Sequence, residues 1–147
     1  MAVVGTGVAA GAQLMVASHV APRVAGFGSD LAYRMHDALL HHEGHNAVTA
    51  APSATASVCA ALTLILDGVG NEAGIATVVG LVAMVVVVTS TLFVFAPAND
   101  EIRQSLTQAE RPDYDAIGRR WRRANLVRAA CGSLSFMAFT IAALAAS

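Results

Sequence analysis

The sequence predicts an all-α integral membrane protein: a four-transmembrane-helix bundle with short amphipathic helices in two of its loops, in a single domain of residues 1–147. Residues 74–96 carry no charged side chain, and a helix of about 20 apolar residues spans the hydrocarbon core of a bilayer. Only 13% of all residues are charged, about half the share of a typical soluble domain. All nine basic residues are arginines, and they fall on one side of the predicted arrangement.

The first predicted span covers residues 2–20 and ends before Pro22. No basic residue precedes it, so it lacks the charged start of a signal peptide and we expect it to be retained. Gly7 and Gly11 form a GxxxG pair, which suits either helix packing within the chain or a dimer face. Gln13, in mid-span, is expected to face the bundle interior because lipid offers its amide no partner.

The other predicted spans cover residues 47–66, 74–96 and 124–146. The pair Asp67-Gly68 closes the second span, and Pro97 is expected to stop the third. The middle of the third span is a run of valines that would suit a buried strand in a soluble protein. A helix is favoured because a segment of this length in lipid must satisfy its own backbone hydrogen bonds.

The placement of charge predicts the orientation. Arg23 and Arg34 lie between the first and second spans, and the other seven arginines lie between the third and fourth or just inside the fourth. The turn between the second and third spans contains Asp67 and Glu72 and no arginine. By the positive-inside rule, the arginine-rich loops are cytoplasmic and both termini lie outside, in a multi-pass protein of the cell membrane.

Both arginine-rich loops are expected to contain helices that lie along the membrane surface. Apolar and amphipathic side chains recur in them near helical spacing. The positions are Leu31, Met35, Leu39 and His42 in the first loop, and Ile102, Leu106 and Ala109 in the second.

The first arginine-rich loop contains a histidine cluster, His41, His42 and His45. On a helix, His41 and His45 share a face at a spacing that can hold one metal ion, and Asp37 lies four residues before His41. Histidine also suits proton transfer because its ordinary pKa lies near neutrality. Three interpretations stay open: a patch facing solvent or lipid headgroups, a proton-transfer group at a substrate site, and a metal site.

A second group of polar residues lies near the third and fourth spans. Trp121, Asn125 and Arg128 follow helical spacing and form one stripe, in which Trp121 is expected to anchor at the membrane interface. Arg128 lies a turn inside the apolar segment and must snorkel or find a partner, for which Asn99 and Asp100 are the candidates. Arg128 is either a structural tie or a group that stabilises an anion in a pocket.

Several functional classes lack support in the sequence. A net charge of −1 gives no case for binding nucleic acid. No GxSxG, phosphate-binding loop or dinucleotide-binding motif is present. Cys59 and Cys131 lie in apolar stretches without a CxxC pattern and are expected to be small buried hydrophobic residues. The second and third spans hold no charged residue to mark an ion path, so transport is disfavoured.

Three short motifs, spread over most of the chain, suggest a family. They are Gly11-Ala12 followed by Pro22, Pro97-x-Asn99-x-x-Ile102, and Trp121-x-x-x-Asn125-x-x-Arg128. With these motifs the chain resembles the anthrone oxygenase-like family of small four-span membrane proteins. The histidine cluster lies outside all three motifs.

The resemblance implies an O2-dependent oxidation of a lipophilic aromatic or quinone-like substrate, such as an anthrone-type polyketide that becomes an anthraquinone. A histidine base would remove the acidic methylene proton, and Arg128 would stabilise the resulting anion. The electron-rich anion can react with O2 directly, so the chemistry requires no cofactor, and the metal content stays open. The predicted catalytic residues are His41, His42, His45, Asn99, Asn125 and Arg128.

A competing hypothesis is a non-catalytic accessory subunit that packs against a larger membrane complex. Its motives are the small size of the chain, the Gly- and Ala-rich spans and the sparse polar interior. The expected partners are therefore the lipid bilayer and either a lipophilic small molecule or other membrane subunits.

Overall fold

The computed structural model describes residues 2–41, 43–108 and 114–146, without the side chains of residues 2, 39–52 and 67. Outside the connecting segments every described residue is helical, and these ranges contain no strand, which confirms the all-α prediction. The helices in chain order are α1 (Ala2–Met15), η1 (Val16–Val20), α2 (Ala21–Ala25), α3 (Ser29–His41), α4 (Glu43–Asp67), α5 (Glu72–Ser90), η2 (Thr91–Phe95), α6 (Ala96–Leu106) and α7 (Tyr114–Ala145), where η marks a π-helical turn.

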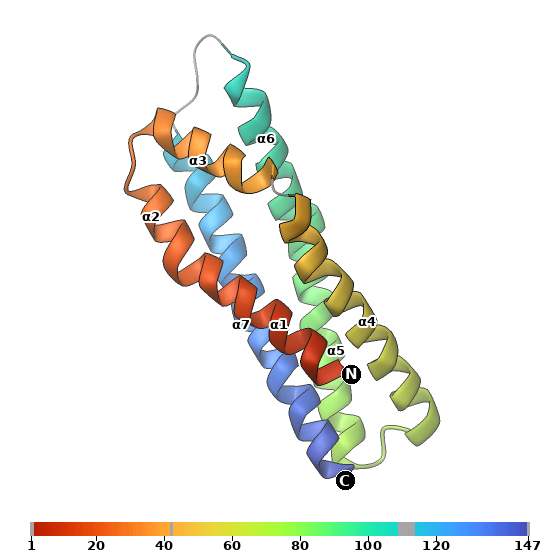
Figure 1. Cartoon of the computed structure of the whole chain (residues 1–147). Helices are drawn as coiled ribbons and strands as arrows, with labels where there is room; N and C mark the ends of the chain where they lie inside the picture. The colour runs from red at the N-terminus through yellow and green to blue at the C-terminus, as the bar shows by residue number, and fades with distance from the viewer. Residues whose placement is uncertain (1, 42, 109–113, 147) are drawn as a thin grey trace.

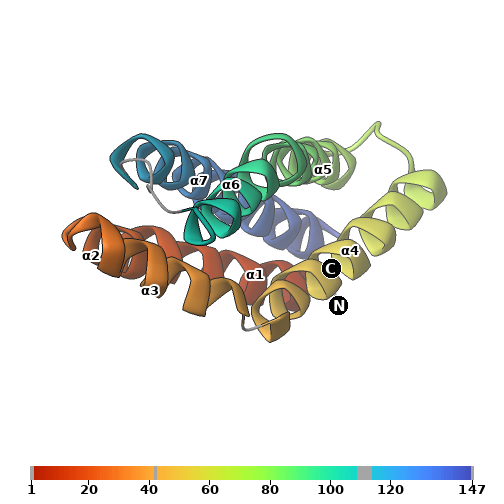
Figure 2. The ribbon, with the colours of Figure 1, turned by 90° about the horizontal axis from the view of Figure 1, so that it is seen from above.

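Three of the helical segments are long and apolar enough to cross a membrane: Val3–Ala25, Glu72–Leu106 and Tyr114–Ala145. They correspond to the first, third and fourth predicted spans. The remaining long helix, α4, has a shorter apolar part within its described residues, Ser53–Leu66. Helix α5 packs mainly on α7, and α1 packs on both α4 and α7 (Figures 1 and 2).

The predicted stop at Pro97 is wrong, because the helix continues through this residue to Leu106, and the first span likewise continues past Pro22. Proline lacks an N–H, and its ring collides with the carbonyl four residues earlier. In both segments a π turn lies directly before the proline, and the amide N–H of the residue before the proline bonds five residues back: Ala96 to Thr91, and Ala21 to Val16. This wider turn accommodates the proline without ending the helix.

The arginine-rich loops contain helices, as predicted, but their details differ. Helix α3 buries Ala32, Tyr33 and His36, whereas Leu31 and Met35 of the predicted stripe are exposed. The reason is that the Tyr33 and His36 rings pack on α7, which the spacing of aliphatic residues does not reveal. Helix α7 begins ten residues before the predicted span, so several arginines project from a helix rather than from a loop.

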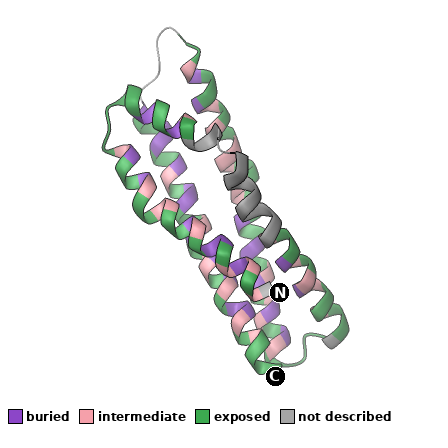
Figure 3. Ribbon diagram, viewed as in Figure 1, coloured by how far each residue is buried: buried purple, intermediate pink, exposed green. Residues whose placement is uncertain are grey.

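A core at this end joins the short helices to the long ones. It consists of Val24, Ala32, Tyr33, Ala98, Ile102, Tyr114 and Ile117, which come from α2, α3, α6 and α7. Elsewhere the outward faces of the long helices carry exposed apolar side chains, such as Ile75, Val85 and Phe93 (Figure 3). Such faces suit hydrocarbon as the surrounding solvent.

The described arginines gather at the end of the molecule formed by α2, α3, α6 and the start of α7 (Figure 1). The opposite end is the turn between α4 and α5. There the side chain of Asn71 caps α5 by accepting a hydrogen bond from the amide of Gly74 at 2.7 Å. Gly74 packs directly on the backbone of Gly68 and Val69, where a Cβ atom would collide.

Candidate active site

A cavity of about 580 Å³ lies among α1, α4, α5, η2, α6 and α7, and we call it the polar cavity. Its walls are mostly apolar, but three of its lining side chains carry an amide or a guanidinium group: Gln13, Asn99 and Arg128. An apolar hollow with a few convergent polar groups is the usual form of a small-molecule site.

The π turn η2 shapes one wall of this cavity. Thr91, Leu92 and Phe95 all line the cavity. The Thr91 hydroxyl donates to the carbonyl of Val87 in its own helix at 2.7 Å. The Phe95 ring stacks on Trp121 with 5.8 Å between centroids. The guanidinium carbon of Arg128 lies 4.4 Å from the centroid of the Phe95 ring. π turns within long helices are often found at functional sites.

Arg128 lies half-buried at this cavity without a carboxylate partner among the described residues. Its Nε atom is buried and makes no hydrogen bond there. Asp100, one of its predicted partners, is exposed, whereas Asn99 shares the cavity with it. Arg128 therefore stays close to an aromatic face with donors available to a ligand, since a guanidinium is always charged and only donates.

A buried aromatic cluster of His36, Tyr114 and Trp121 packs against Phe95 of the cavity wall. His36 is 0% exposed, its Nδ1 shares a hydrogen bond of 2.9 Å with the Tyr114 hydroxyl, and its ring lies 4.3 Å from that of Trp121. Burial lowers the pKa of His36 to about 4, and a hydrogen-bonding influence of Asn99 opposes this shift. The pairing with Asn99 is incomplete, because His36 Nε2 and Asn99 Oδ1 both lack a partner of good geometry among the described residues.

Gln13 faces the interior as predicted, with 6% of its surface exposed. Its Oε1 atom is buried without a hydrogen bond to any described residue and packs against Gly132 of α7, where a Cβ atom would collide with it. The neighbouring GxxxG pair does not act as one face. Gly7 packs on the ring of Phe136 within the chain, whereas Gly11 has open space beside it.

The predicted catalytic residues fall into three groups. Asn99 and Arg128 line the polar cavity together. Asn125 is buried but not part of the lining, and its Nδ2 donates to the carbonyl of Trp121 at 3.2 Å. His42 lies outside the described residues, and His41 and His45 are described only as backbone, at the end of α3 and the start of α4.

The sequence interpretation missed two parts of this site. Trp121 is 3% exposed and packs between His36 and Phe95, so it is not an interfacial anchor. His36 was overlooked in favour of the cluster a turn later, although it lies within the helix-spaced stripe that starts at Leu31. Its three-residue spacing from Tyr33 was the available signal. Within the described side chains, no group of three or more His, Cys, Asp or Glu is placed to hold a metal ion.

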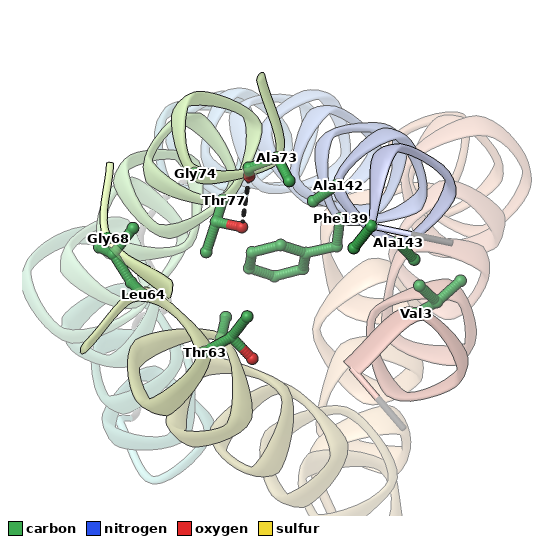
Figure 4. A pocket seen from close by; sticks show the side chains of 12 residues that line it. Val3, Thr63, Leu64, Gly68, Ala73, Gly74, Thr77, Phe139, Ala142 and Ala143 are labelled. Atoms are coloured by element: carbon green, nitrogen blue, oxygen red, sulfur yellow. Dashed lines mark hydrogen bonds between the residues drawn. The ribbon is translucent and has the colours of Figure 1, made fainter. Parts of the chain in front are cut away.

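A second hollow of about 170 Å³, which we call the apolar pocket, lies at the opposite end (Figure 4). Phe139 points into it from α7, opposite Thr63 of α4 and Thr77 of α5. Both threonine hydroxyls donate to the carbonyl four residues earlier in their own helices, at 3.0 and 2.8 Å. No unpaired side-chain polar atom of a described residue lines this pocket.

The chain is a small helical protein with three segments long and apolar enough to cross a membrane and with a cavity between its helices. The profile of the anthrone oxygenase family matches residues 38–138, more than half of the chain. The chain therefore belongs to the anthrone oxygenase family, and the resemblance drawn from its motifs is confirmed. Neither a curated protein nor a solved structure matches the chain.

Proposed function

We propose that this protein oxidises a flat lipophilic aromatic substrate of the anthrone type with O2, in the polar cavity. The observation that carries the proposal is a cavity of about 580 Å³ whose few strong polar groups are the Gln13 and Asn99 amides and the Arg128 guanidinium. The reaction balances as anthrone plus O2 giving anthraquinone plus water. The methylene carbon loses one proton to a base, gains a C–O bond to O2, and becomes a carbonyl as the hydroperoxide loses water.

In this mechanism Arg128 stabilises the anion. Removing the methylene proton places negative charge on the ring system and on the carbonyl oxygen. Prepositioned donors in a site that excludes water are typically worth about 10²- to 10³-fold in rate. Arg128 lines the cavity and has no competing carboxylate among the described residues. The cluster His41, His42 and His45 supplies the proton acceptor, and Asn125 lies one turn before Arg128 on α7, where its amide donates to the carbonyl of Trp121.

The substrate enters from the membrane. Val58, Val88 and Leu92 line the cavity and are also 60%, 49% and 59% exposed, so an apolar rim connects the cavity to the outer face between α4 and α5. An apolar aromatic compound concentrates in the bilayer, and this rim offers it a path without polar groups.

We also propose the topology. Helix α4 is the fourth crossing, the arginine-rich end is cytoplasmic, and both termini lie outside. Support comes from the gathering of the described arginines at one end of the molecule (Figure 1). Single cysteines introduced at the exposed positions 70 and 104, in a chain whose Cys59 and Cys131 are replaced by alanine, test this by reaction with an impermeant reagent on intact cells. Labelling at residue 104 and not at 70 would contradict the orientation.

Oxygen uptake by purified protein in detergent, with an anthrone as the substrate, tests the reaction. We expect uptake with formation of the quinone chromophore, and with ¹⁸O2 one heavy atom in the new carbonyl. Arg128→Leu and His41→Ala should lose activity, while Thr77→Val in the apolar pocket should keep it. Absence of quinone formation above the uncatalysed rate, together with a protein partner that co-purifies in fixed ratio, would instead indicate the accessory subunit.

A further inference from the structure

We propose that His36 and Tyr114 are positioning residues that orient the Asn99 amide so that its NH2 group faces the polar cavity. There it joins Arg128 as a second donor to one anionic oxygen of the substrate. This inference rests on the proposed function for the identity of the substrate. It adds His36 and Tyr114, which are not among the predicted catalytic residues, to Asn99 and Arg128, which are.

The geometry of Asn99 is the starting observation. The residue lines the cavity, yet its Oδ1 atom is fully buried and has no hydrogen-bond partner of good geometry in the described part of the chain. An asparagine side chain has one accepting oxygen and one donating NH2 group. With the oxygen buried, the NH2 group is the polar group of Asn99 that remains for a ligand.

His36 provides a donor for that buried oxygen. Its Nε2 atom is also buried and equally unpartnered, and the two residues lie close enough for Asn99 to influence the ring as a hydrogen-bond partner. Pairing Nε2–H with Oδ1 satisfies two buried groups at once, each of which is costly when left alone. The lowered pKa keeps the ring neutral near pH 7, so only one of its nitrogens carries a proton.

Tyr114 selects which nitrogen of the His36 ring carries the proton. The tyrosine hydroxyl lies 2.9 Å from Nδ1, and when it donates to Nδ1 the proton of the neutral ring must lie on Nε2. Contacts with the rings of Trp121 at 4.3 Å and Tyr114 at 6.1 Å hold the imidazole in place. The chain of donors then runs from Tyr114 to His36 to Asn99 to the substrate, and each bond fixes the polarity of the next.

A monohydroxyanthraquinone tests this, because its phenolate absorbs in the visible and reports the donors around one oxygen. The probe is titrated in detergent-solubilised protein above pH 6.5, where His36 stays neutral. The wild-type cavity should lower the pKa of the bound phenol by roughly 1 to 3 units relative to empty micelles, as charge and hydrogen bonds favour the anion. His36→Phe and Asn99→Leu should each remove roughly 1 unit of this lowering, and Tyr114→Phe a smaller part.

The double variant gives the sharper result. Because both residues act through one hydrogen-bonded unit, His36→Phe with Asn99→Leu should shift the probe no further than Asn99→Leu alone. Ser105→Ala, a buried hydroxyl on the same helix as Asn99, should leave the titration unchanged.

Two outcomes would overturn the inference in different ways. A His36→Phe protein that binds the probe with the wild-type phenol pKa would show that His36 does not orient Asn99, and would leave the proposed function intact. A wild-type protein that binds the probe without lowering its pKa, or does not bind it, would remove the anion site and the proposed function together.

Discussion

The polar cavity and the apolar pocket are walled by many of the same helices, yet they differ in how their polar atoms are used. In the apolar pocket, the hydroxyls of Thr63 and Thr77 donate to carbonyls of their own helices, and the other lining residues are all Ala, Gly, Leu, Val or Phe. In the polar cavity, Gln13, Asn99 and Arg128 each hold a buried atom without a partner among the described residues.

This difference indicates which hollow was shaped for a ligand. An unpaired buried polar atom costs about 1 to 3 kcal/mol, and lipid supplies no water to replace the missing bond. The apolar pocket avoids that cost and is a gap between small side chains. The polar cavity has several such unpaired atoms, as expected where a substrate completes the hydrogen bonds.

Replacing Arg128 is the most direct test of this difference between the polar cavity and the apolar pocket. We expect Arg128→Leu to lower the rate of anthrone oxidation about 100-fold or more, since it removes the charge that stabilises the anion. Oxygen uptake under saturating substrate measures the effect, and size-exclusion chromatography with circular dichroism checks the fold. A rate within a few-fold of wild type would assign Arg128 a structural role.

Acid should lower the free energy of unfolding, because it protonates His36 at the arginine-rich end. The pKa of His36 is about 4 in the folded chain against 6.5 when exposed, so the unfolded state binds the extra proton between these values. Stability is therefore full above pH 6.5 and falls as the pH drops towards 4, by roughly 3 kcal/mol at most.

Thermal unfolding in detergent across this range measures the loss. His36→Gln should flatten the profile because it removes the titrating group, whereas His19→Gln, on an exposed residue, should leave it unchanged. An unchanged slope in His36→Gln would show that other groups cause the acid sensitivity.

The apolar pocket should respond to substitution in stability rather than in catalysis. Gly74→Ala places a Cβ against the backbone of Gly68 and Val69, which cannot move as a side chain would. We expect a loss of about 2 kcal/mol in the free energy of unfolding, in the range of other overpacked sites. Gly70→Ala has open space and is the matched control in the same turn. Equal melting temperatures for the two variants would contradict the close contact.

The smallest expected effect concerns the rim of the polar cavity. Val88→Phe narrows the apolar path and should raise KM about 5-fold, near 1 kcal/mol, with kcat little changed. Val82→Phe is the control, since this residue is exposed on the same helix but does not line the cavity. Steady-state kinetics with a lipophilic anthrone distinguishes the two, and an equal KM in both variants would remove the proposed path between α4 and α5.

Much of this architecture follows from local signals. The uncharged segment around Val85 to Val88 predicts a spanning helix because only internal backbone bonding is possible in lipid. Asn99 and Arg128 were predicted as a pair because a cation inside an apolar segment needs a polar neighbour. The helix boundaries at Pro22 and Pro97 were predicted wrongly, because a proline signals a helix end in most settings and a π turn is not visible in the residue pattern.

The sequence by itself therefore determined the helical class, the family and the gathering of arginines, since each depends on residue type and on spacing along one chain. Only the tertiary structure decided that His36 packs against Tyr114 and Trp121, and that Phe95 lies beside both Trp121 and Arg128. Those contacts join α3, η2 and α7, and no periodicity within one helix can encode how the faces of different helices meet. The physical reason is that side-chain packing between helices selects one arrangement from many that share the same hydrophobic pattern.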